Sequence, residues 1–406
     1  MDEATPLRPT GWDVCSGVVL GHVSPPGAPT RPARTGPGGG GADPRPESPL
    51  AALEEAVLPA LRRPPCLVSF SGGLDSSLVL AVAVRVARRA GLPEPIPATW
   101  RFTDAPRADE SGWQDRVVAA LGCPSWQVLR ADDDLDLTGP VARRMLLRHG
   151  LLHPANTHLH LPVVELASGG SLLTGAGGDQ VLAGWRRRHP GPPYRRLRAA
   201  AHRWWRDTQR QPSARDLFPW LRPEVAAEVH RLLRAERRAE PRRLVERIAW
   251  HTGRRDLRLT RAALAEIAAH HRVRLVHPLL DDRFLAALTD RAGHRRCPSR
   301  ADLLAEIAGD ALPGVVTAPR RKARFLEVFL RTPTRRFVRA WDGRGVDTDL
   351  VDVEALRRAW SRWPIPGGTA TLVQQAWLAT TTVRPVTPVT QNSRRPSDTE
   401  TTEARS

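Results

Sequence analysis

The chain has 406 residues, a length that predicts two or three domains with a well-buried core. Its formal net charge is +18, but only one of the 61 basic residues is lysine, so we interpret the charge as arginine-rich surface and disfavour a nucleic-acid partner. The four widely spaced cysteines and the acidic N-terminus argue against a disulfide framework, export and membrane insertion, and we expect a cytoplasmic protein.

The first part of the chain predicts little regular structure. Residues 1–24 form a short N-terminal segment in which residues 12–23 are typical of a strand or hairpin. Residues 25–49 are rich in proline and glycine and predict a flexible linker. A helix over residues 50–61 then leads into the first core strand.

Strand and helix signals alternate from residue 50 to residue 185. We expect strands over 66–68, 96–102, 126–129 and 171–174, with helices over 78–87, 109–121 and 162–167 between them. This alternation predicts an α/β fold with a doubly wound, mainly parallel sheet, and ligands at the carboxyl ends of its strands.

Strand signals stop near residue 185, and the next segment, 186–382, is predicted to be mostly helical. Amphipathic patterns favour helices over 223–239, 242–250 and 261–270. The last segment, 383–406, is rich in Thr, Pro, Ser and charge, which predicts disorder.

A glycine-rich loop follows the first predicted strand. It has the sequence Ser69-Phe70-Ser71-Gly72-Gly73-Leu74-Asp75-Ser76-Ser77 and opens the helix after it. Adjacent glycines let a ligand approach the backbone, and the hydroxyls and amides at a helix N-terminus favour phosphate. No lysine follows the last glycine, so the loop is not a Walker P-loop and its cation must come from elsewhere.

A second small-residue loop follows the strand at 171–174. It runs Thr174-Gly175-Ala176-Gly177-Gly178-Asp179-Gln180 and carries one carboxylate. Such a loop could close over a nucleotide, although Asp179 alone is equally typical of a turn or helix cap.

The first loop resembles the pyrophosphate loop of the ATP pyrophosphatases, and the two loops together resemble the synthetase domain of the asparagine synthetase family. The resemblance implies an adenine-nucleotide α-hydrolase type of fold and the use of ATP and Mg²⁺. It assigns Mg²⁺ to Asp75 and Asp179, two hard oxygen ligands. Nucleotide contacts would come from Ser69, Ser71, Gly72, Gly73, Asp75, Ser76, Ser77, Phe102, Thr174 and Gly175.

The second loop also departs from the family pattern. The family has acidic residues where this chain has Ala176 and Gln180, and the related β-lactam and carbapenam synthetases have tyrosine at the first of these positions. The base that removes a proton is therefore unassigned, which disfavours ordinary asparagine synthesis.

Further motifs lie in the helical half. Arg320-Arg321-Lys322-Ala323-Arg324-Phe325 resembles the family's R-x-K-x-x-F segment and implies that Lys322, the single lysine, is catalytic. A compact ammonium can follow charge that develops between phosphates, whereas a guanidinium is a fixed fork. The segment at 277–283 resembles the family's P-x-L-D-x-R segment, in which we interpret Asp281 as structural. His153, His158 and His160 are too loosely spaced to favour zinc.

We therefore expect an AMP-forming, ATP-dependent amide ligase that joins a small-molecule or peptide carboxylate to an amine or ammonia. Residue 2 is aspartate and about 60 residues precede the first strand, so we expect no glutaminase domain of its own. A separate protein could deliver ammonia or a peptide. The asparagine-synthetase-like macrolactam synthetases of lasso peptides are ATP-dependent amide ligases of this kind, so a peptide substrate is one option. The alternatives are a tRNA-modifying enzyme with the same loop and a non-catalytic nucleotide-binding relative.

Overall fold

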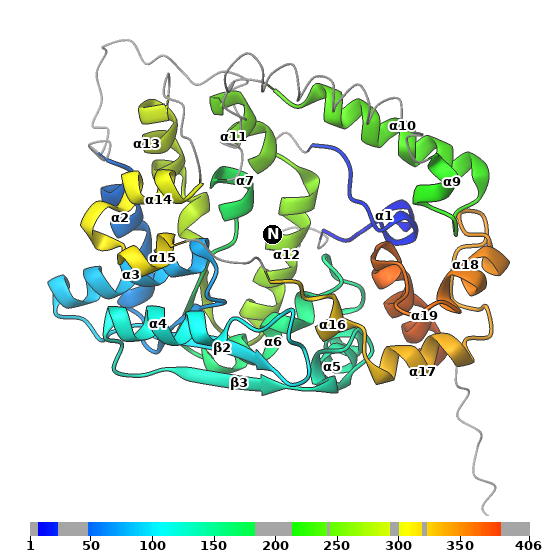
Figure 1. The fold of residues 1–406 in the computed structure, drawn as a ribbon, viewed down its shortest axis with the longest axis horizontal. Helices are drawn as coiled ribbons and strands as arrows, with labels where there is room; N and C mark the ends of the chain where they lie inside the picture. The colour runs from blue at the N-terminus through cyan, green and yellow to red at the C-terminus, as the bar shows by residue number, and fades with distance from the viewer. Residues whose placement is uncertain are drawn as a thin grey trace, which may run out of the picture.

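The computed structural model describes residues 7–22, 48–182, 213–241, 244–292, 300–318 and 323–382 (Figure 1). Most of the predicted linker, the predicted disordered tail and Lys322 lie outside these ranges. Within them, no helix is long and apolar enough to cross a lipid bilayer.

One sheet of five parallel strands forms the centre of the α/β part. Its order is β3-β2-β1-β4-β5. The second and third strands therefore lie on one side of β1, and the fourth and fifth lie on the other side. This confirms the predicted doubly wound parallel sheet. The neighbours β1 and β4 therefore form the point at which the strand order reverses, where ligands bind in such sheets. The strands are β1 (Cys66–Ser69), β2 (Ile96–Phe102), β3 (Gln127–Ala131), β4 (Ser171–Thr174) and β5 (Arg274–Val276).

Successive strand residues face opposite sides of the sheet and join two separate hydrophobic cores. Val68 and Leu173 belong to one core, and their neighbours Leu67 and Leu172 belong to the other. Around the first core pack α2 (Pro49–Leu61), α3 (Leu74–Ala90), α4 (Ser111–Leu121), α7 (Gly178–Leu182), α11 (Leu244–Thr252), α13 (Asp282–Ala292), α14 (Arg300–Ala308) and α15 (Gly314–Thr317). Around the second pack α5 (Pro140–His149), α6 (Leu161–Leu166) and α12 (Arg255–His270).

A third hydrophobic core joins the N-terminal helix to the C-terminal helices, which lie together at one end of the molecule in Figure 1. Its centre holds three tryptophans, of which Trp220 donates its indole N–H to the Cys15 carbonyl at 2.8 Å. The helices are α1 (Gly11–Ser16), α9 (Ala214–Leu217), α10 (Pro223–Ala239), α17 (Thr332–Ala340), α18 (Val353–Trp360) and α19 (Ala370–Thr382), with α16 (Leu326–Phe329) between this core and the sheet. We call this group the C-terminal helical cluster.

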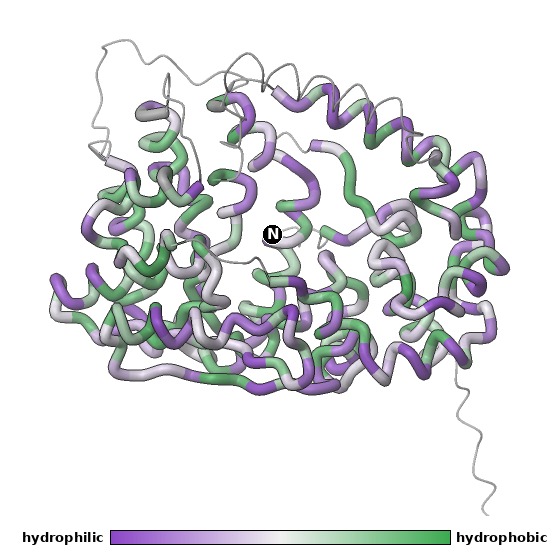
Figure 2. Tube along the Cα trace, viewed as in Figure 1, coloured by the Kyte–Doolittle hydropathy of each residue, from purple (hydrophilic) through white to green (hydrophobic). Residues whose placement is uncertain are grey.

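The helical half matches its predicted pattern closely. α10 has the predicted bounds, and in Figure 2 hydrophilic and hydrophobic residues alternate along it, as expected of a helix that packs with one side only. Short 3-10 turns complete the described chain: η1 (Asp133–Leu135), η2 (Thr157–His160), η3 (Pro278–Leu280), η4 (Gly309–Ala311) and η5 (Gly367–Thr369).

Two predictions of local structure are wrong. The strand or hairpin expected at 12–23 begins instead as the helix α1, because Thr10 and Asp13 form a reciprocal capping box at its N-terminus. Beyond residue 185 no strand was expected, yet β5 pairs with β4 in parallel. β5 has only three residues and lies at the edge of the sheet, so its own sequence carries too few residues to show a strand pattern.

Candidate functional site

The two glycine-rich loops meet at the carboxyl ends of β1 and β4. Ser69, the last residue of β1, is in register with Thr174, the last residue of β4. The first loop (residues 69–77) and the second loop (residues 174–180) therefore start side by side. They also pack closely, because a Cβ on Gly175 would lie 3.0 Å from the backbone nitrogen of Ser76. A larger residue at Gly175 would push the loops apart.

The first loop is held by its own serines. The hydroxyl of Ser71 accepts from the Gly73 N–H at 3.1 Å, and the hydroxyl of Ser76 accepts from the Ser71 N–H and donates to the Gly73 carbonyl. Gly72 has φ +84°, a conformation that favours glycine. Ser77 is fully buried with its hydroxyl directed at the Gly72 carbonyl, so its side chain supports the loop from inside.

The N-terminus of α3 has no side-chain cap from its own N-cap residue. Gly73 is its N-cap and no side chain caps it, so backbone N–H groups and the positive end of the helix dipole face the loop. This 17-residue helix begins at Leu74, directly after the two glycines. An anion such as a phosphate group is the ligand that such a helix end favours.

A buried glutamine that the sequence prediction missed supports the same loop. Gln114, on α4, is 3% exposed and donates its amide to the Ser71 carbonyl at 3.1 Å and to the Trp100 carbonyl at 3.4 Å. It therefore ties the first loop to β2. Its position among apolar residues of an amphipathic helix was the available signal, since a polar residue on a buried face needs a partner.

The two predicted metal-binding carboxylates lie close enough to share one cation. Arg300, the first residue of α14, forms ion pairs with Asp75 and with Asp179, the second at 2.8 Å. The Arg300 side chain is 13% exposed and that of Asp75 20%, whereas that of Asp179 is 69% exposed. Burial lowers the pKa of Arg300, but both carboxylates raise it further, so the guanidinium stays charged.

The two side chains are of the chemical type that binds Mg²⁺. One positive group already spans both carboxylates, and carboxylate oxygens are the ligands that Mg²⁺ prefers. Gly178 leaves room for the Asp75 carboxyl group, because a Cβ on Gly178 would overlap it. Among the described residues, no group of three or more His, Cys, Asp or Glu side chains could hold a metal, so further ligands would come from substrate or water.

The start of the second loop is fixed by a histidine. The hydroxyl of Thr174 lies 2.6 Å from Nδ1 of His277, just before η3, and also accepts from the Ala176 N–H at 3.2 Å. Burial is the main cause that lowers the pKa of His277 to about 4, and the nearby Arg261 and His160 add smaller electrostatic contributions. The imidazole is therefore neutral at pH 7 and shares one hydrogen bond with Thr174.

The segment that follows Lys322 is anchored at the carboxyl end of β2. Arg324 donates its backbone N–H to the Arg107 carbonyl at 2.8 Å, and Phe325 packs edge-on against Phe102 with ring centroids 5.9 Å apart. Phe102, a predicted nucleotide contact, is the last residue of β2. Lys322 itself lies outside the described residues.

Other residues singled out in the sequence have partners of their own. Asp281 accepts from the backbone N–H groups of Arg283 and Phe284, which begin α13, as expected of a structural residue. His153 is paired with Asp256 at 2.7 Å. His158 is fully buried, with its two ring nitrogens near backbone carbonyls.

Comparison with known protein families matches residues 50–383 to the model described as asparagine synthase. The match covers both loops, the Arg300 position and the segment around Lys322. A search of curated proteins finds no match.

Proposed function

The chain belongs to the asparagine synthase family of ATP-dependent amide ligases, and we propose that it activates a carboxylate as an acyl-adenylate before forming an amide. A carboxylate oxygen attacks the α-phosphorus of ATP, the bond to the β-phosphate oxygen breaks, and pyrophosphate leaves. An amine nitrogen then attacks the acyl carbon, loses a proton and expels AMP.

One observation carries this proposal. Two glycine-rich loops follow adjacent parallel strands where the strand order reverses. Their carboxylates, Asp75 and Asp179, both form ion pairs with the guanidinium of Arg300. Open parallel sheets bind nucleotides at this position. The uncapped N-terminus of α3 suits the leaving pyrophosphate, which carries several negative charges.

Each part of the site has a role in this scheme. The first loop, with Ser71, Gly72, Gly73 and Ser76, would bind the β- and γ-phosphates through N–H and hydroxyl groups. Asp75 and Asp179 would hold Mg²⁺, which when bound neutralises phosphate charge. Thr174, Gly175, Ser69 and Phe102 would position the nucleotide, and Lys322 would stabilise charge that develops on pyrophosphate.

The experiment that tests the activity is exchange of labelled pyrophosphate into ATP. The purified protein is incubated with ATP, Mg²⁺ and a panel of carboxylates that includes aspartate and short peptides with acidic side chains. We expect exchange with at least one carboxylate and AMP as the nucleotide product. Formation of ADP and phosphate instead would rule out adenylation.

A pair of variants links the exchange to the site. Asp179→Asn removes one carboxylate from the pair that Arg300 bridges, and we expect exchange to fall at least about tenfold with a higher Mg²⁺ requirement. Asp310→Asn is the matched control, because the Asp310 side chain is 83% exposed and pairs with Arg85 at the surface. Equal activity of the two variants would remove Asp179 from the proposed site.

A further inference from the structure

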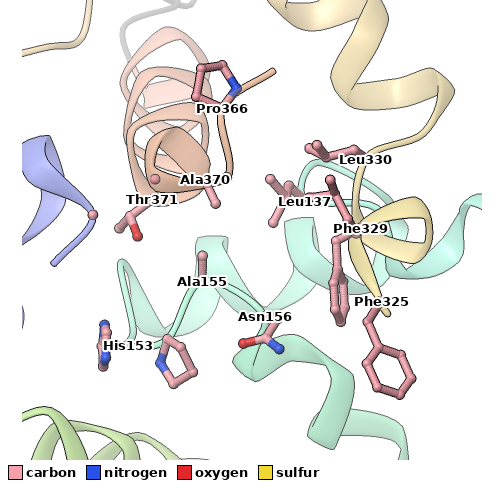
Figure 3. Close-up of a pocket in the computed structure, with 15 residues that line it drawn as sticks. Leu137, His153, Ala155, Asn156, Phe325, Phe329, Leu330, Pro366, Ala370 and Thr371 are labelled. Atoms are coloured by element: carbon pink, nitrogen blue, oxygen red, sulfur yellow. The ribbon is translucent and has the colours of Figure 1, made fainter. Parts of the chain in front are cut away.

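A cavity of about 320 Å³ lies between the sheet and the C-terminal helical cluster (Figure 3). In this view Phe325 and Phe329 of the α16 region line one side, His153 lies on the opposite side, and Pro366, Ala370 and Thr371 lie above. This volume is at the lower end of the range for small-molecule sites. The remaining lining residues are Gly17, Leu137, Pro154, Ala155, Asn156, Leu326, Leu330, Gly367 and Gly368.

The lining is apolar and carries no counter-charge. Among the described residues that line it there is no Asp, Glu, Lys or Arg, and the ring of His153 is already paired with Asp256. A free amino acid has both an ammonium and a carboxylate, which are costly to bury without opposite charges. The cavity therefore favours an uncharged group. Leu326 is 48% exposed, which adds apolar surface for an incoming ligand.

Two polar groups in the lining are available to a ligand. Neither the Asn156 amide nor the Thr371 hydroxyl makes a side-chain hydrogen bond to any residue that the structure describes, and Thr371 is only 7% exposed. An asparagine amide offers one acceptor and two donors, the complement of the C=O and N–H of a peptide group. A hydroxyl that faces a cavity can donate one hydrogen bond and accept others, so a ligand that pairs with it gains affinity.

The cavity lies next to the proposed ATP site. Phe325 lines it and also packs against Phe102 at the end of β2. Phe325 is three residues after Lys322, and the intervening Arg324 is hydrogen-bonded to Arg107 in the loop after β2. A group bound in the cavity would therefore lie beside Phe102, a residue that we assign to the nucleotide.

We propose that this cavity binds an apolar residue of a peptide substrate, with its peptide group hydrogen-bonded by Asn156 and Thr371. The assignment of the occupant as substrate rests on the proposed ligase function. It places the substrate among uncharged, apolar peptide segments rather than free aspartate.

Binding of N-acetyl-L-phenylalaninamide, a neutral peptide-like probe, tests the cavity without requiring catalysis. Isothermal titration calorimetry should give a Kd on the order of 1 mM, as expected for a ligand of this size. Aspartate should not displace the probe. Ala370→Phe, which fills the cavity from α19, should weaken binding at least about tenfold.

Further variants separate loss of the cavity from loss of the fold. Asn156→Leu and Thr371→Val keep the size of the side chains while removing their polar groups, and each should weaken probe binding about threefold or more. Ala120→Phe on α4, where the alanine is exposed, is the matched control and should bind normally. Melting temperatures establish that each variant is folded.

The proposed ligase function and the proposed peptide-binding cavity can be rejected independently. Unchanged probe binding in folded Ala370→Phe, displacement by aspartate, or no binding to the unaltered protein at about ten times the expected Kd would overturn the cavity proposal. Pyrophosphate exchange is measured on the same samples. If aspartate supports exchange and Ala370→Phe does not change it, the ligase function is supported and the peptide occupant is rejected. If the probe binds but no carboxylate supports exchange, the cavity is supported and the ligase function is rejected.

Discussion

Lys322 stands apart because arginine serves every other basic position of this chain. If its charge only attracted phosphate, Lys322→Arg would be nearly silent. If its ammonium must follow the charge on leaving pyrophosphate, the change should lower kcat about 10²-fold, roughly 3 kcal/mol, with ATP binding almost unchanged. We expect the second result, measured by steady-state kinetics and direct ATP binding.

The reciprocal change supplies the control for Lys322. Arg231→Lys alters an exposed arginine that pairs with Glu228 on the surface of α10, and it should leave both measurements unchanged. A Lys322→Arg enzyme with full turnover would show that catalysis does not require a lysine at this position.

Arg300 occupies the place between the two carboxylates that bind Mg²⁺ in our proposal. Arg300→Met should remove the positive charge that pairs with Asp75 and Asp179 and lower the free energy of unfolding by about 1–3 kcal/mol, less than for a fully buried pair because Asp179 is largely exposed. Added Mg²⁺ should restore part of this loss. The measurement is the melting temperature with and without Mg²⁺, in the absence of nucleotide.

The matched variant is Arg283→Met, which removes an arginine from a surface pair with Glu55. It should change the melting temperature little and respond to Mg²⁺ as the unaltered protein does. If Arg300→Met behaves in the same way, the two carboxylates do not form a cation site.

At the level of elements, the contact between α7 and the first loop depends on a glycine, which has no side chain. A Cβ at Gly178, the first residue of α7, would overlap the Asp75 carboxyl group, so Gly178→Ala should displace one or the other. We expect a loss of about 1–3 kcal/mol in stability and at least about a tenfold loss of pyrophosphate exchange.

Gly112→Ala tests whether this effect is local. Gly112 also lies at a helix start, on α4, but a Cβ there meets nothing within 4 Å. Alanine should be neutral or stabilising by up to about 1 kcal/mol, because glycine loses more backbone entropy in a helix. Similar losses in both variants would mean that the Asp75 contact is not special.

Elements with a strong local pattern could be predicted from the sequence, and those defined by distant partners could not. The strand at Ser171–Thr174 was predicted with its bounds because it is a buried apolar run that ends at glycines. β5 was missed because it becomes a strand only by pairing with β4.

The same distinction holds within the candidate site. Asp75 and Asp179 were expected together because each is part of a loop with a recognisable spacing. Arg300 was missed because it looks like any other arginine in this composition, and only the position of α14 brings it to the carboxylates. The cavity beside Phe325 could not be predicted, since five separate segments of the chain line it.

For the molecule as a whole, histidines whose pKa is lowered by burial, His160 and His277 among them, make stability depend on pH. Burial is the main cause that lowers the pKa of His160 and of His277 from 6.5 to about 4 in each case. Between about pH 6.5 and 4 the unfolded chain binds more protons than the folded one, so stability is complete above pH 6.5 and falls as the pH drops. A shift of this size corresponds to a loss on the order of 3 kcal/mol for His277.

Urea unfolding at about pH 7.5 and about pH 5 measures this dependence. His277→Gln should reduce the difference in unfolding free energy between the two pH values, whatever its effect on stability at either one. His22→Gln, which changes an exposed imidazole, is the control and should preserve the difference. An undiminished difference in His277→Gln would show that His277 does not couple folding to protons.

The strand order also bears on how the chain is made on the ribosome. β1 pairs with β2, the next strand along the chain after α3, and with β4, which is synthesised only after α4, β3, α5 and α6. Until residue 174 has emerged, one edge of β1 has no partner, and exposed strand edges promote aggregation. A translation product that ends between β3 and β4 should therefore accumulate in inclusion bodies, although it already contains the complete first loop.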